Sequence, residues 1–95
     1  MPKLSINDLR EYLECNKMLA RELLTNPLGE LADILEEYGK SLMEDIQTGF
    51  AAMSEAEKTN LRTNQEFLTL VNDLDGLTDI ISIAMEKKEK LIKQQ

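Results

Sequence analysis

The sequence contains no histidine, no tryptophan and a single cysteine, Cys15, in 95 residues. Without histidine the chain lacks the commonest acid–base group and the usual zinc ligand, and the lone thiol has no imidazole to activate it. One cysteine cannot form an internal disulfide, which favours a reducing compartment. We therefore expect a non-enzymatic cytoplasmic protein with no metal, cofactor or small-molecule substrate.

Residues that favour β-strands are also scarce. Aromatic residues make up 4% of the chain, and Val71 is its one valine. A core must then come from Leu, Ile, Met and Ala, a composition typical of helices. Because 42% of residues are hydrophobic and 31% charged, we expect residues 1–95 to fold as a single all-α domain.

Long apolar runs and a net positive charge are missing as well. No stretch approaches the roughly 20 apolar residues of a membrane span, and residues 1–25 lack the apolar segment of a signal peptide. The formal net charge of −7 disfavours nucleic acid and anionic membranes as partners. Residues 87–95, however, carry four lysines and one glutamate, which either complement a helix C-terminus or contact a partner protein.

Start and stop signals divide the chain into three predicted helices. Ser5 precedes the first apolar stripe as an N-cap, and Asn26-Pro27 interrupts the pattern. Ser54 with Glu57 three residues later forms a capping box that opens the last segment. We expect helices over about 6–24, 28–48 and 55–93.

The last segment has the most regular pattern, with a heptad seam that lasts about three and a half repeats. The Asp75-Gly76 pair is a turn signal inside this seam, but the heptad phase continues across it. The predicted fold is an antiparallel three-helix hairpin or bundle with a long C-terminal helix, or a four-helix bundle if the chain turns at Gly76. The seam consists of Phe67, Leu70, Leu74, Leu77, Ile81, Ala84, Lys88 and Leu91.

The carboxyl end of this seam holds more apolar side chains than one short chain is expected to cover. Exposed apolar residues at helical spacing are typical of coiled-coil or helix-in-groove binding. We expect a protein-interaction module, of adaptor or chaperone type. A self-assembling homo-oligomer and an acidic inhibitor of a basic partner are the alternatives. The predicted partner-binding residues are Leu77, Ile80, Ile81, Ala84, Met85 and Leu91, with Leu9 and Leu13 as a second patch.

The small size, the acidity and the heptad apolar residues of this chain resemble those of the small helical chaperones of bacterial export systems. Such chaperones hold aggregation-prone subunits until export. The resemblance extends over the whole chain as a physical profile and implies a helical fold and a protein client.

Overall fold

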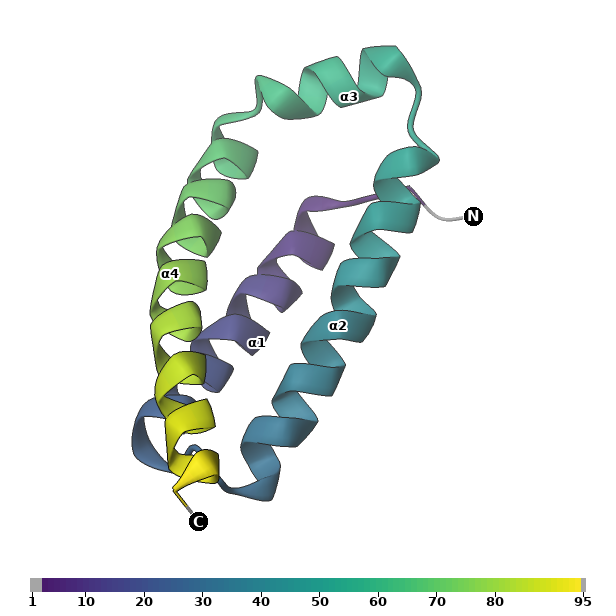
Figure 1. The fold of residues 1–95 in the computed structure, drawn as a ribbon. Coiled ribbons are helices and arrows are strands. Elements are labelled where there is room, and N and C mark those ends of the chain that lie inside the picture. Colours follow the sequence, from purple (N-terminus) through teal and green to yellow (C-terminus); the bar gives the residue numbers. More distant parts are fainter. Residues whose placement is uncertain (1–2, 95) are drawn as a thin grey trace.

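The computed structural model describes residues 3–94, and within that range the chain forms four helices and no strand (Figure 1). The helices are α1 (Ile6–Thr25), α2 (Glu30–Ala51), α3 (Glu55–Arg62) and α4 (Gln65–Lys93). The protein is an all-α helical bundle, as its composition predicts.

Side-chain caps explain where α1 and α3 begin. The Ser5 hydroxyl accepts a hydrogen bond from the Asp8 backbone amide at 3.3 Å, and the Asp8 carboxylate accepts one from the Ser5 amide at 2.9 Å. Ser54 and Glu57 form the same reciprocal pair at the start of α3. Each box satisfies two amides that would otherwise have no partner within the helix, which confirms both predicted starts.

The predicted helix over 55–93 is wrong in one respect, because the chain breaks at Thr63-Asn64 and forms α3 and α4 separately. The Asn64 side chain caps α4 by accepting a hydrogen bond from the Phe67 amide at 3.1 Å. The four-helix alternative put the turn at Gly76, but α4 continues through that glycine without interruption. An asparagine cap, rather than an Asp-Gly turn, therefore divides the segment.

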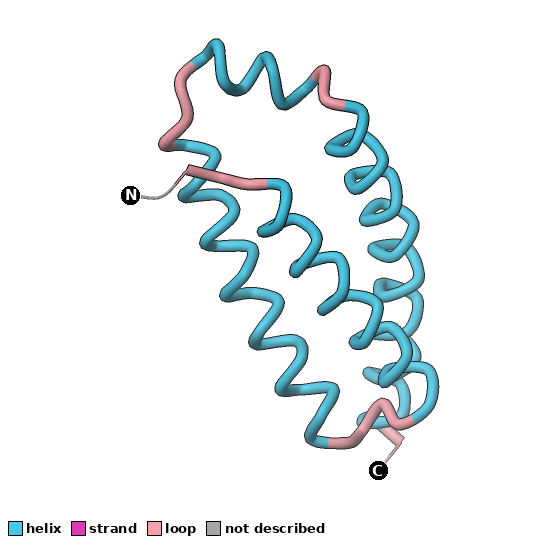
Figure 2. Tube along the Cα trace, turned by 180° about the vertical axis from the view of Figure 1, so that it is seen from behind, coloured by secondary structure: helices cyan, strands magenta, loops and turns pink. Residues whose placement is uncertain are grey.

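The first helix occupies the centre of the fold. α1 packs against α2 on one side and against α4 on the other (Figures 1 and 2). Figure 1 shows α2 running antiparallel to α1 and α4 running parallel to it, while α3 crosses the far end between them. The result is an elongated, thin molecule of 51 × 25 × 17 Å. A protein this thin leaves much of each helix in contact with water.

Two clusters of buried side chains form the core, and α1 contributes to both. The cluster at the α3 end contains Leu9, Leu13, Ile46 and Leu70. The cluster at the other end contains Cys15, Leu19, Leu23, Ala32, Leu35 and Ala84. Burial of these side chains is the main contribution to the stability of the fold.

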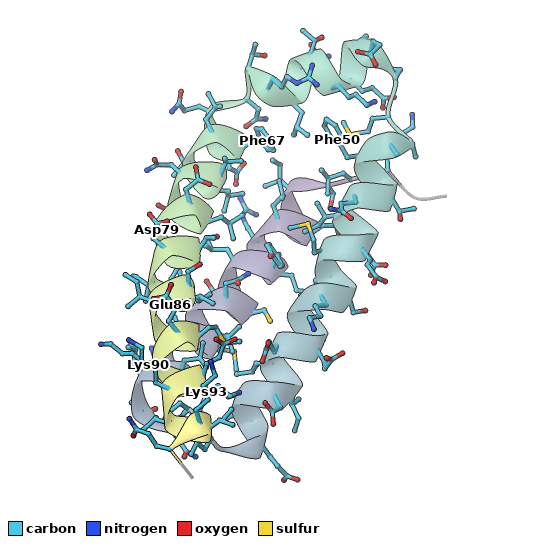
Figure 3. The ribbon with its side chains drawn as sticks, in the orientation of Figure 1. Phe50, Phe67, Asp79, Glu86, Lys90 and Lys93 are labelled. Carbon is cyan, nitrogen blue, oxygen red and sulfur yellow. The ribbon has the colours of Figure 1, made fainter. Side chains whose placement is uncertain are left out.

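The short helix α3 closes the end of the bundle. Its Leu61 is buried, and Lys58 and Arg62 lie over the Phe50 ring at 5.1 and 5.8 Å from the ring centroid. Phe50 and Phe67 lie on the side of α3 that faces the other helices (Figure 3). Cation–π contacts of this kind attach α3 to the end of α2. No helix within residues 3–94 is long and apolar enough to cross a membrane.

Candidate functional site

Three of the residues predicted to bind a partner lie in the core of the chain itself. Leu9 and Leu13 are each 5% exposed and Ala84 is 2% exposed, because α1 covers the inner face of α4. In this conformation their side chains offer almost no surface to another molecule. The prediction did not anticipate that α1 would lie parallel to α4 along most of the seam.

The remaining predicted residues are divided between the core edge and the surface. Leu77, Ile81 and Met85 are half-buried and pack against the two core clusters. Ile80 and Leu91 are exposed, at 45% and 41%. Their role in binding stays a prediction, and only these two are freely accessible.

A different apolar surface lies on α1 and α2. Leu31, Ile34 and Tyr38 follow one another on α2 at spacings of three and four residues and are 45%, 60% and 46% exposed. Met18 on α1 is 51% exposed and lines the same shallow groove as Leu31. We call Met18, Leu31, Ile34 and Tyr38 the apolar strip. Three large apolar side chains at this spacing form one helix face, which is the geometry that coiled-coil partners recognise.

The end of the strip is attached to α1 by a polar contact. The Tyr38 hydroxyl donates a hydrogen bond to the Glu11 carboxylate on α1. This hydrogen bond to the carboxylate raises the pKa of the Tyr38 phenol above its usual value, with burial as a smaller contribution. The contact ties the Tyr38 side chain to α1, although the residue remains 46% exposed.

Carboxylates are the more numerous charged groups beside the strip. Glu30 and Glu37 stand four residues before and three residues after Ile34, so they share its side of α2. Glu22 and Arg21, both from α1, line the groove beside Leu31. The α2 helix as a whole carries six acidic residues and one lysine, Lys40. An exposed apolar stripe with acidic borders is therefore the dominant feature of this side of the molecule.

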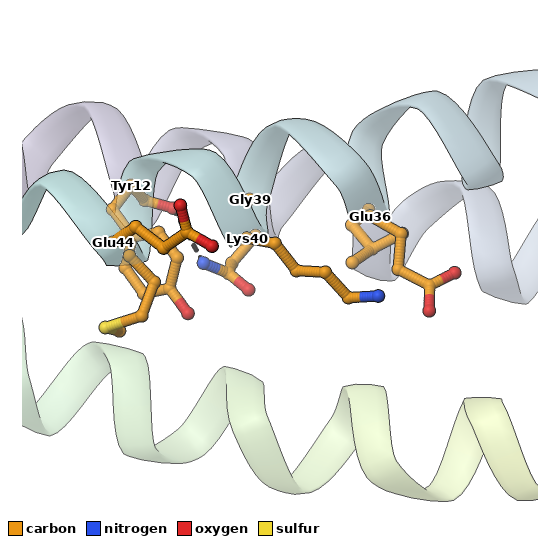
Figure 4. A pocket seen from close by; sticks show the side chains of 8 residues that line it. Tyr12, Glu36, Gly39, Lys40 and Glu44 are labelled. Carbon is orange, nitrogen blue, oxygen red and sulfur yellow. Dashed lines mark hydrogen bonds between the residues drawn. The ribbon is translucent and has the colours of Figure 1, made fainter.

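A second concave region lies on the inner side of α1 and α2, where α4 runs opposite (Figure 4). Leu19 and Met43 give it apolar walls, and Glu36, Lys40 and Glu44 border its opening. The Asn16 side chain in this groove donates a hydrogen bond to the Tyr12 carbonyl at 2.8 Å. On the α1 side of this groove, Leu19 is buried and Tyr12 and Asn16 are half-buried.

The described residues hold no arrangement suited to metal binding or nucleophilic chemistry. Within residues 3–94, no three His, Cys, Asp or Glu side chains come together as a metal site would need. The Cys15 thiol is buried and donates a weak hydrogen bond to the Leu35 carbonyl, with an Sγ···O distance of 3.5 Å. Burial, with the nearby Glu11 charge, raises the pKa of the Cys15 thiol. A thiol held in its protonated form is poorly nucleophilic.

Sequence reasoning missed the apolar strip although the signal was present. Residues 28–46 carry two adjacent apolar rows, and α1 can cover only one of them. Leu35, Ile46 and Ala32 face α1 and are buried, so the neighbouring row of Leu31, Ile34 and Tyr38 stays in water. A helix whose apolar stripe is wider than one partner can cover is the feature that indicates such a surface.

Comparison of the chain with protein-family models, with curated proteins and with solved structures finds no match.

Proposed function

We propose that this chain is a non-enzymatic protein-interaction module that binds an amphipathic helix of a partner protein on the apolar strip. The observation that carries the proposal is the row of Leu31, Ile34 and Tyr38, three large apolar side chains that are each close to half exposed or more. Burying such a row against a partner helix removes apolar surface from water, the usual driving force of helix association.

The charge around the strip supports a basic partner helix. Glu22, Glu30 and Glu37 border the apolar side chains, and the whole chain has a formal net charge of −7. Lysine or arginine residues beside the apolar face of a ligand helix would meet these carboxylates and speed association at low salt. The ligand class we propose is thus a basic amphipathic helix, with the apolar side chains supplying most of the affinity.

The proposed biological roles are adaptor or small acidic chaperone, in either case by reversible burial of a partner helix. The cytoplasmic location belongs to the same proposal and is supported by the buried free thiol of Cys15, which a reducing compartment would keep unpaired. No nucleic acid, membrane or small-molecule substrate is part of the proposal.

A peptide titration tests the proposal. The probes are two fluorescein-labelled 18-residue model helices with the same leucine pattern, one with lysine and one with glutamate at the polar positions. We expect saturable binding of the lysine peptide by fluorescence anisotropy, with the glutamate peptide at least about tenfold weaker. Added salt should weaken the lysine peptide only in part, because the apolar contact persists.

A matched pair of variants locates the binding surface. Ile34→Asp places a charge in the strip, whereas Leu68→Asp makes the same kind of change at a 44% exposed residue on α4. Ile34→Asp should weaken the lysine peptide at least about tenfold while Leu68→Asp leaves it within about twofold. Equal effects of the two substitutions, or no saturable binding by the unmodified protein, would refute the proposal.

A further inference from the structure

The C-terminal part of α4 combines exposed apolar side chains with lysines, which is the combination that we propose for a ligand of the apolar strip. Ile80, Ile83, Lys87 and Leu91 follow one another at spacings of three, four and four residues, so they lie along one side of the helix. Ile80, Ile83 and Leu91 are all exposed, at 45%, 57% and 41%. Lys90 lies on the side of α4 turned away from α2 (Figure 3). We call Ile80, Ile83, Lys87, Lys90 and Leu91 the basic face.

The basic face and the apolar strip are complementary in charge and in pattern. The strip has apolar residues at 31, 34 and 38 with Glu30 and Glu37 beside them. The basic face has exposed isoleucines and a leucine with lysines beside them, in a segment where residues 87–93 hold four lysines and one glutamate. The ion pairs found among the described residues do not involve Lys87 or Lys90. The basic face is therefore open to a contact between molecules, whereas Glu37 beside the strip already pairs with Lys40 at 3.5 Å, in a solvent-exposed pair that a lysine of another copy would have to replace.

The two surfaces lie at the same end of the molecule. Lys88 on α4 donates a 2.9 Å hydrogen bond to Asp33 on α2, which places the last turns of α4 beside the part of α2 that carries the strip. At this end α4 contacts α2 directly through Lys88 and Asp33, and the exposed side chains of the strip and of the basic face are open to solvent instead of packed on each other. A twofold axis at this end would let each copy offer its basic face to the strip of the other, and both contacts would close in one dimer.

We infer that the basic face of a second copy of this chain packs on the apolar strip and forms a symmetric dimer. This contact exists when no foreign helix is bound. The inference rests on the strip described under the proposed function but needs no foreign partner. A partner helix would then compete with dimer formation, so that partner binding releases the monomer.

Sedimentation equilibrium on a pair of charge-reversed variants tests the dimer. One variant carries Glu30→Lys and Glu37→Lys, and the other carries Lys87→Glu and Lys90→Glu. Each variant alone would face like charges across the contact and should be monomeric at concentrations where the unmodified chain is dimeric, a loss of affinity of at least about tenfold. Mixed in equal amounts, the two should form a heterodimer, because both contacts then pair opposite charges.

The mixing result is specific because both variants keep a negative net charge. Each Glu→Lys change adds two charge units and each Lys→Glu change removes two, starting from a formal charge of −7. General electrostatic attraction therefore cannot join the two variants, and circular dichroism of each will establish that it remains helical.

An unmodified chain that stays monomeric up to millimolar concentration, or variants that stay monomeric when mixed, would overturn the inference. If the labelled lysine peptide still binds in that case, the proposed function stands and only the dimer fails.

Discussion

The Lys88 ammonium group on α4 and the Asp33 carboxylate on α2 are joined by a 2.9 Å hydrogen bond across 55 positions of sequence. Lys88 is the one charged residue among those buried in the described chain, at 8% exposed, and Glu36 lies 3.9 Å from its ammonium group. Lys88 also occupies a position of the heptad seam at which the pattern predicts an apolar residue. Its aliphatic stem fills that position, and its charge reaches the acidic side of α2.

Replacing Lys88 separates the contribution of the stem from that of the charge. Lys88→Ala removes both and should lower the free energy of unfolding by about 1–2 kcal/mol, because packing is lost and Asp33 and Glu36 are left without their cation. Lys88→Met keeps most of the stem and should cost less than about 1 kcal/mol. Urea denaturation followed by circular dichroism measures both values. A methionine variant as unstable as the alanine variant would show that the charge dominates.

Adjacent leucines near the end of α1 provide a test of the core. Leu23 is 3% exposed and belongs to a core cluster, whereas Leu24 is 63% exposed. Leu23→Ala should lower the free energy of unfolding by about 2–4 kcal/mol, since it removes buried methyl groups and leaves a cavity. Leu24→Ala should change it by less than about 0.5 kcal/mol. Similar losses for the two variants would contradict the packing of α1 described above.

Two helical glycines should respond in opposite ways to the same substitution. A Cβ on Gly76 would have no neighbour within 4 Å, so Gly76→Ala should raise the stability of the protein by about 0.5–1 kcal/mol through helix propensity. A Cβ on Gly49 would lie 2.9 Å from the backbone nitrogen of Leu4 and 3.1 Å from its Cα. Gly49→Ala should therefore destabilise the protein by displacing the segment before α1. Thermal melting of the two variants checks the signs, and stabilisation by both would exclude the close approach at Leu4.

The capping box of α3 makes part of the stability pH-dependent. Hydrogen bonds from Ser54 and Lys3 lower the pKa of the Glu57 carboxyl from 4.5 to about 2. Because the pKa in the folded state is lower than in the unfolded state, the stabilisation is present above about pH 4.5 and is lost as the pH falls toward 2. Glu57→Gln should lose less stability over that pH range than the unmodified chain. Urea denaturation at several pH values measures this, and parallel pH profiles would show that Glu57 does not contribute.

The thiol of Cys15 should be protected in the folded protein. It is 4% exposed, and the carbonyl of Leu35 accepts its hydrogen bond. Burial raises the pKa of the Cys15 thiol and so lowers the fraction of reactive thiolate at pH 8. Ellman's reagent should react at least roughly tenfold more slowly with the native chain than with the chain in urea. Equal rates would mean that α1 and α2 separate readily in solution.

The local features of this fold were predictable because they depend on neighbouring residues. Ser5 with Asp8 and Ser54 with Glu57 form capping boxes in the structure, where the spacing predicts them. The first helix ends at Thr25, one residue beyond the expected limit, because Asn26-Pro27 cannot continue it. The break at Thr63-Asn64 was missed because a lone asparagine cap is a weaker signal than the Asp-Gly pair that follows it.

The exposed surface was predicted less well. The surplus of apolar residues that the sequence indicates does exist, but Leu9, Leu13 and Ala84 of the predicted patch are core, and α2 carries a second exposed row that was not predicted. Periodicity shows which residues share a helix face. It does not show which neighbouring helix covers that face.

The sequence by itself determined the helical class, the absence of disulfide and histidine chemistry, and the capped starts of α1 and α3, since each follows from composition or from contacts within a few residues. Only the tertiary structure decided that α1 lies between α2 and α4. That placement buries Leu9, Leu13 and Ala84 and leaves Leu31, Ile34 and Tyr38 in water. The physical reason is that a narrow central helix can cover one face of each neighbour, and which face it covers depends on packing across the whole chain.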